Sequence, residues 1–208
     1  MLYMEFEEKD AVSSAKKILK AAIENFPKRD KSKINIPKEK TEMIAGFTTE
    51  NVFYHLGGQF RPSYRPLNDN IMNGRIRGVV GVVGCSNPKN ESGLAHVRMV
   101  IELLRHDILV VETGCAAIEC AKAGLLTPEA AFKYAGKGLQ EVCKAVGIPP
   151  VLHNGSCVDN TRIVIECCEM VREGGIGNSI DELPVAGAAP EWMSEKAITI
   201  GWYVVASG

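Results

Sequence analysis

The sequence lacks the features that mark several large classes of protein. Lys and Arg number 24 against 25 Asp and Glu, and this balance argues against a strongly basic nucleic-acid binder. No apolar run reaches the roughly 18 residues that a membrane-spanning helix needs, so no membrane-spanning helix is expected. The acidic start, MLYMEFEEKD, has no apolar signal core, and we therefore expect a cytoplasmic protein.

Common nucleotide and hydrolase motifs are missing as well. The chain has no P-loop, no G-x-S-x-G elbow and no H-E-x-x-H pair. Gly78, Gly81 and Gly84 recur every third residue inside an apolar run, whereas a dinucleotide fingerprint follows a strand as G-x-G-x-x-G. Seven cysteines, with no C-x-x-C pair and none before Cys85, indicate neither a disulfide framework nor a zinc ribbon.

The remaining pattern indicates one folded domain with an appendage. Residues 10–26 have the apolar spacing of an amphipathic helix, and residues 27–41 form a charged connector punctuated by proline. We therefore divide the chain into an amino-terminal helix with its connector, 1–41, and an α/β domain, 42–208.

The second region alternates between predicted strands and helices. Strands are predicted at 42–47, 76–84, 107–114, 148–156 and 183–189, and a basic loop at 61–66. Helices are predicted at 93–106, 115–124, 127–145 and 157–173, and from Pro190 to about residue 206. This alternation predicts an α/β fold with a Rossmann-like parallel sheet and helices on both faces.

Three cysteines directly follow predicted strands. Cys85, Cys115 and Cys157 each lie at a strand-to-helix turn with a glycine close before them, and such turns share one edge of a parallel sheet. Helix N-termini favour the thiolate form, and three soft ligands favour an iron–sulfur or mixed-metal cluster over a single zinc ion. The competing interpretation is that each cysteine is only a small buried hydrophobic residue.

The other candidate ligands are interpreted as structural. Cys120, Cys143, Cys167 and Cys168 are predicted to pack on helix faces. His153 lies near a cysteine turn and could bind substrate or a cluster ligand, but a structural role is favoured.

Four segments together resemble the nickel-containing carbon monoxide dehydrogenases of anaerobes. They are GVVGCSNPK at 81–89, ILVVETGCAA at 108–117, VLHNGSCVDNTR at 151–162 and APEWMSEKA at 189–197. The resemblance runs from about residue 42 to the end. It implies oxidation of CO with water to CO2 at a nickel–iron–sulfur cluster, with Cys85 and Cys115 as iron ligands, Cys157 as the nickel ligand and Lys196 as a catalytic acid–base.

The chain also departs from that family. Its members are longer and take further cluster ligands from earlier sequence, so the chain looks like a carboxy-terminal piece that is inactive alone. The resemblance implies that the full enzyme is a homodimer that passes electrons to a redox protein such as ferredoxin. Two alternatives stay open: a hybrid-cluster (prismane-type) hydroxylamine reductase, which Trp192, Met193, Lys196 and Ala197 also fit, and a non-catalytic apo scaffold with free thiols.

Overall fold

The computed structural model describes residues 8–58, 63–89 and 91–191, together with residues 198, 199, 202 and 206. The chain divides into two compact units, Met1–Lys40 and Thr41–Gly208. The first unit contains the helix that the sequence predicted, α1 (Ala11–Asn25). Short 3-10 turns flank α1: η1 (Glu8–Asp10), η2 (Phe26–Lys28) and η3 (Lys31–Lys33).

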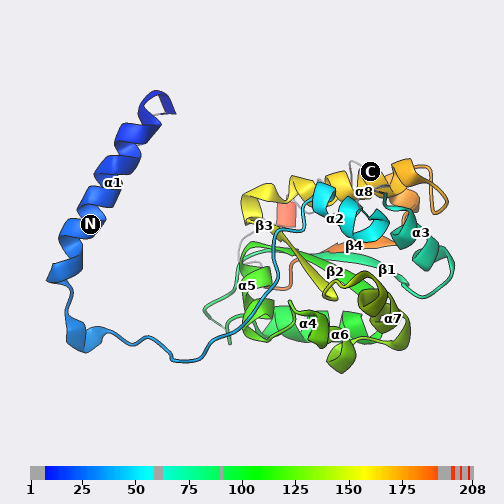
Figure 1. Cartoon of the computed structure of the whole chain (residues 1–208), viewed down its shortest axis with the longest axis horizontal. Helices are drawn as coiled ribbons and strands as arrows, with labels where there is room; N and C mark the ends of the chain where they lie inside the picture. Colours follow the sequence, from blue (N-terminus) through cyan, green and yellow to red (C-terminus); the bar gives the residue numbers. More distant parts are fainter. Residues whose placement is uncertain are drawn as a thin grey trace. The chain divides into compact units, whose positions relative to one another are not determined.

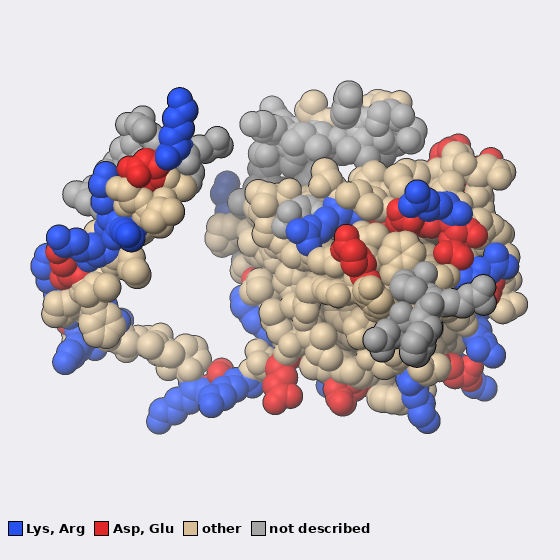
Figure 2. Space-filling view, turned by 45° about the horizontal axis from the view of Figure 1, so that its top comes forward, with Lys and Arg blue, Asp and Glu red and all other residues tan. Residues whose placement is uncertain are grey.

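The first unit is basic and carries exposed apolar side chains. Residues 8–40 contain ten Lys and Arg against five Asp and Glu, and Figure 2 shows the basic side chains spread along this unit. Val12, Leu19 and Ile23 of α1 are each more than 60% exposed. None of the described helices has both the length and the hydropathy needed to cross a membrane.

The second unit is built on a sheet of four parallel strands. They are β1 (Gly78–Val82), β2 (Ile108–Thr113), β3 (Val151–Gly155) and β4 (Val185–Ala188). Their order across the sheet is β3-β2-β1-β4, and every neighbouring pair is parallel. The predicted Rossmann-like parallel sheet is therefore confirmed. The chain reverses its direction of winding between β1 and β4, which is the topological switch point of such a sheet.

Helices cover both faces of the sheet (Figure 1). One face packs against α4 (Leu94–Arg105) and α5 (Gly114–Lys122). Beyond them, α6 (Pro128–Tyr134) packs against α4, with α7 (Lys137–Val146) beside α6. The other face lies under α2 (Thr49–Gly57), α3 (Arg65–Met72) and α8 (Thr161–Glu173). Short 3-10 turns, η4 (Cys157–Asp159) and η5 (Ile180–Glu182), precede α8 and β4.

β1 and most of β2 are apolar on both faces because both faces are covered. Val79, Leu109 and Val111 point toward the layer of α2, α3 and α8, where they line a small cavity. Val110 and Val82, on the opposite face, are completely buried. This double coverage explains why these two strands appear in the sequence as nearly unbroken apolar runs.

Two predicted elements differ in the structure. Residues 42–47 form no strand, although the backbone N–H of Ile44 donates to the Leu126 carbonyl at 2.8 Å and that of Phe47 donates to the His153 carbonyl at 3.1 Å. These separate bonds hold an extended segment without building a ladder. The helix predicted at 127–145 is two helices, α6 and α7, because the chain turns at Gly136, where an added Cβ would lie 2.5 Å from Asp107 Oδ1.

Two further segments need correction or lie partly outside the described residues. Arg65 and Pro66, predicted to end a loop, begin α3, with the proline in the first turn where helices tolerate it. Pro190 and Glu191 form a turn and not a helix start, and most of the helix predicted to follow them lies outside the described residues.

Candidate metal centre

The three strand-end cysteines lie at the same edge of the sheet. Cys85 comes three residues after β1, Cys115 lies in the first turn of α5 directly after β2, and Cys157 opens η4 after β3. Because β1, β2 and β3 are neighbours and parallel, their carboxyl ends meet at one edge. All three thiols belong to exposed residues, so the competing interpretation of small buried hydrophobic residues is wrong for them.

The Cys115 and Cys157 turns touch each other. Gly114 has a φ of +58°, and a Cβ built on it would lie 2.9 Å from Cys157 Cβ. A side chain at this position would therefore strain the backbone and push Cys157 away. The Thr113 hydroxyl also donates to the Asn160 side chain, so the end of β2 is bonded to the turn that carries Cys157.

The Cys85 loop is bonded to the helices on either side of it. The Ser86 hydroxyl donates to Glu119 Oε1 of α5 at 3.1 Å. The ring Nε2 of His96, in the first turn of α4, lies 3.3 Å from the Cys85 carbonyl oxygen. His96 is fully buried, so this contact is shielded from water. The loop after β1 is thus bonded both to α4 and to α5.

Glu191, three residues beyond β4, accepts three backbone hydrogen bonds at this edge. Its carboxylate accepts from the backbone N–H groups of Asn87 at 2.8 Å, Gly93 at 3.1 Å and Ala95 at 2.9 Å. Burial by itself would raise the pKa of Glu191, but the three donors outweigh it and lower the pKa below its ordinary value. The sequence reasoning did not single out Glu191 or His96, since a buried polar residue leaves no periodic signal.

A second carboxyl group lies beneath the cysteine edge, within the core. Glu112 of β2 is completely buried, and the Cys120 thiol donates to its Oε1 at 3.2 Å. Burial raises the pKa of Glu112 to about 8, against the smaller opposing effect of the Cys120 hydrogen bond. Oε2 of Glu112 finds no hydrogen-bond partner among the described residues. The group is therefore held as a neutral acid at pH 7.

The remaining cysteines divide between core and surface. Cys120 and Cys143 are buried, as predicted, and burial raises the pKa of the Cys143 thiol to about 12. Cys167 is partly buried, and burial raises its pKa to about 11. The packing prediction is wrong for Cys168, which is exposed on α8.

His153 has a structural setting, as favoured from the sequence. Its Nδ1 accepts from the backbone N–H of Gly155 at 3.1 Å, and its carbonyl accepts from Gly46 and Phe47. Burial lowers the pKa of His153, so the ring is neutral at pH 7. The contacts hold the residue 42–47 segment against β3.

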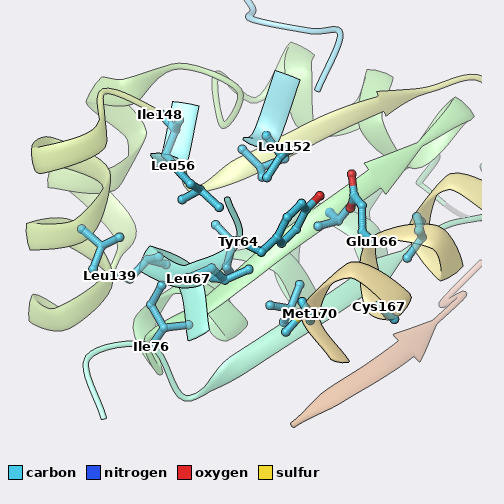
Figure 3. A pocket seen from close by; sticks show the side chains of 16 residues that line it. Leu56, Tyr64, Leu67, Ile76, Leu139, Ile148, Leu152, Glu166, Cys167 and Met170 are labelled. Atoms are coloured by element: carbon cyan, nitrogen blue, oxygen red, sulfur yellow. The ribbon is translucent and has the colours of Figure 1, made fainter. Parts of the chain in front are cut away.

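A small cavity on the other face of the sheet holds two polar groups in an apolar lining (Figure 3). Tyr64 is almost fully buried, and its hydroxyl has no partner among the described residues. Glu166 of α8 accepts from the Asn154 amide at 2.9 Å, and burial raises its pKa to about 7. These groups belong to the core and not to the cysteine edge.

Comparison with known proteins shows which family the chain belongs to. A sequence model described as the Prismane/CO dehydrogenase family matches residues 1–208. The chain belongs to the Prismane/CO dehydrogenase family. The match includes the first 41 residues, which the motif resemblance did not reach.

Curated relatives of the chain include carbon monoxide dehydrogenases. The chain is 53% identical to carbon monoxide dehydrogenase 1 of Methanosarcina acetivorans over 205 residues, and 42% identical to carbon monoxide dehydrogenase 1 of Carboxydothermus hydrogenoformans over 215 residues. The alignments cover 99% of this chain but only 32% and 34% of those proteins. The chain thus spans about a third of the length of the relatives it matches.

A solved structure agrees with the sequence comparison. The Ni-free carbon monoxide dehydrogenase from Thermococcus sp. AM4 superposes with a TM-score of 0.87 at 46% identity. That similarity covers 100% of this chain and 32% of the other.

The chemistry of these three thiols fits a metal–sulfur cluster. Three exposed thiols at one edge are soft ligands of the kind that iron–sulfur clusters take. Within the described ranges, however, no group of three or more His, Cys, Asp and Glu side chains is close enough to hold a metal ion. Lys196, the predicted acid–base, lies outside the described residues.

Proposed function

We propose that this chain forms the α/β part of an anaerobic nickel–iron–sulfur carbon monoxide dehydrogenase and contributes three cluster ligands. Cys85 and Cys115 would bind irons, and Cys157 would bind nickel. The observation that carries the proposal is the position of the three cysteines at the ends of three adjacent parallel strands, in a chain 53% identical to a carbon monoxide dehydrogenase.

The physical setting of the three thiols favours metal binding. Cys115 lies in the first turn of α5, where a helix leaves backbone N–H groups free to donate to a bound cluster. The contact between Gly114 and Cys157 keeps two of the ligand turns adjacent without a side chain between them. Exposure leaves each cysteine accessible to metal and to further ligands from sequence that this chain does not contain.

In the full protein the edge would serve the oxidation of CO with water to CO2, two protons and two electrons, the chemistry that such a cluster supplies when bound. Lys196 would move a proton near the substrate. The proposal includes a homodimer and a redox partner such as ferredoxin, which rest on the family resemblance alone. The cytoplasmic location stays a prediction from the sequence. We expect the isolated chain to be inactive in CO oxidation with a viologen acceptor, because three ligands do not complete the set.

The test is the iron, nickel and acid-labile sulfide content of the chain after anaerobic reconstitution. We expect wild-type protein to retain iron and sulfide, and Cys157→Ala to lose nickel while it keeps iron. Cys168→Ala is the matched control, since Cys168 is an exposed cysteine on α8 away from the strand ends. The assigned role of Cys157 would be refuted if Cys157→Ala kept its nickel, or if Cys168→Ala lost as much nickel as Cys157→Ala.

A non-catalytic apo scaffold is the second candidate, and one observation favours it. The three thiols are exposed, yet the described residues bring no three metal-binding side chains together. This candidate predicts rapid alkylation of Cys85, Cys115 and Cys157 by iodoacetamide even after reconstitution, whereas bound metal would protect them. A hydroxylamine reductase is less favoured, because the relatives reported above are all named carbon monoxide dehydrogenases.

A further inference from the structure

We propose that Glu191 is a positioning residue for the Cys85 ligand: its carboxylate holds the Cys85 loop against the first turn of α4 and thereby sets where the Cys85 thiol lies. The inference rests on the proposed function, because it assigns Glu191 a role toward a cluster ligand. The hydrogen bonds themselves belong to the chain and can be tested without metal.

The first support is that Glu191 replaces a missing helix cap. The N-cap position of α4 is Gly93, which has no side chain to accept hydrogen bonds from the free N–H groups of the first turn. Oε1 of Glu191 accepts from Ala95, and Oε2 accepts from Gly93. The N-terminus of α4 is therefore capped by a residue nearly a hundred positions away in the sequence.

The second support is that the same oxygen reaches the cysteine loop. Oε2 also accepts from the N–H of Asn87, two residues after Cys85, at 2.8 Å. One carboxylate therefore joins the loop to the start of the helix that follows it. Because Glu191 is only 4% exposed, water competes weakly for these bonds.

The third support is that three successive residues of the loop are bonded to three different elements. The Cys85 carbonyl lies against His96 of α4, the Ser86 hydroxyl donates to Glu119 of α5, and Asn87 donates to Glu191 beyond β4. A loop held at each residue presents its thiol in one place, as a pre-organised metal site requires.

The sheet topology explains why the residue comes from β4. β4 pairs with β1 at the switch point, so the chain leaving β4 emerges beside the loop that leaves β1. Cys115 and Cys157 lie on the other side of β1 and are kept adjacent through Gly114. Among the three predicted ligands, Cys85 is the one whose loop Glu191 bonds.

Two measurements on the 208-residue chain test the proposal. Amide hydrogen exchange by NMR reports whether Glu191 holds the loop, and a titration with Co²⁺ alone, followed by thiolate-to-cobalt absorption, reports how well the thiols bind metal. Glu191→Gln keeps the side-chain volume but turns an amide N–H₂ toward backbone donors. Glu182→Gln is the matched control, since Glu182 also accepts from a backbone N–H, that of Asn178 at 2.8 Å, and is exposed.

We expect exchange at Asn87, Gly93 and Ala95 to accelerate about tenfold or more in Glu191→Gln, with the amides of β1 and β2 unchanged as the control for folding. We expect Co²⁺ affinity to fall by about tenfold in Glu191→Gln, and neither quantity to change in Glu182→Gln. If Glu191 acts through Cys85, the double variant Cys85→Ala with Glu191→Gln will bind Co²⁺ no more weakly than Cys85→Ala alone.

The other possible outcomes each contradict a specific part of the proposal. Unchanged exchange in Glu191→Gln overturns the inference outright. Faster exchange with unchanged Co²⁺ affinity, or additive losses in the double variant, overturns the positioning role and leaves Glu191 as a helix cap. If the wild-type chain binds no Co²⁺, the proposed ligand role of the chain fails, and the exchange data alone decide whether Glu191 holds the loop.

Discussion

The buried acid Glu112 makes folding stability depend on pH in a predictable direction. Its pKa is raised from an ordinary value of 4.5 to about 8 in the folded chain, chiefly by burial. Between these two values the unfolded chain releases the proton while the folded chain keeps it. The unfolded state therefore binds fewer protons, and the free energy of unfolding falls as the pH rises.

The size of the effect follows from the two pKa values. Each pH unit in this interval costs about 1.4 kcal/mol, so Glu112 lowers the free energy of unfolding by about 3 kcal/mol between pH 4.5 and pH 7. The loss continues to about pH 8 and then levels off. Glu112→Gln keeps the shape and the acceptor for the Cys120 thiol but cannot ionise, so its stability relative to wild type should rise by this amount.

The assay is urea unfolding at half-unit steps from pH 5 to pH 8, followed by far-ultraviolet circular dichroism. The quantity of interest is the difference between variant and wild type, in which the other titrating groups cancel. Glu102→Gln is the control, because Glu102 is exposed and hydrogen bonds from Arg105 and His106 lower its pKa. A difference for Glu112→Gln that stays constant across this range would refute the buried, neutral state of Glu112.

Two further substitutions test the packing and the cysteine edge. Gly114→Ala should lower the free energy of unfolding by about 1–2 kcal/mol, because position 114 has a positive φ. It should also change the alkylation rate of Cys157, because the new methyl group would press against the Cys157 side chain. Gly124→Ala, also at positive φ but with open space around it, should share the strain and leave Cys157 unchanged. Leu104→Ala, in the fully buried face of α4, should cost about 2–5 kcal/mol in urea unfolding, whereas Met99→Ala on the exposed face of the same helix should cost much less.

The sheet could be predicted from the sequence because its cause is local. Strands such as 107–114 are buried on both faces, so apolar residues run without alternation and end at glycine-containing turns. The shared edge of Cys85, Cys115 and Cys157 then followed from the rule that parallel strands end together. Among the described residues, the sheet contains four such strands, and they are parallel, as predicted.

The features that the sequence did not predict depend on tertiary contacts. The break between α6 and α7 depends on the close approach of Gly136 to Asp107, which lies 29 residues earlier in the sequence. The 42–47 segment is held by single bonds to Leu126 and His153, which its own residues do not reveal. Glu191 was quoted only within a motif, since its partners lie about a hundred residues away.

The distance along the chain between Glu191 and the Cys85 loop has a consequence for biosynthesis. The bond from Asn87 to Glu191 spans 104 residues. At a synthesis rate of about 5–20 residues per second, the ribosome makes the Cys85 loop roughly 5–20 seconds before it makes Glu191. A metal that reached Cys85 in that interval would meet a loop without this anchor, so loading of an ordered edge has to wait until Glu191 has been translated.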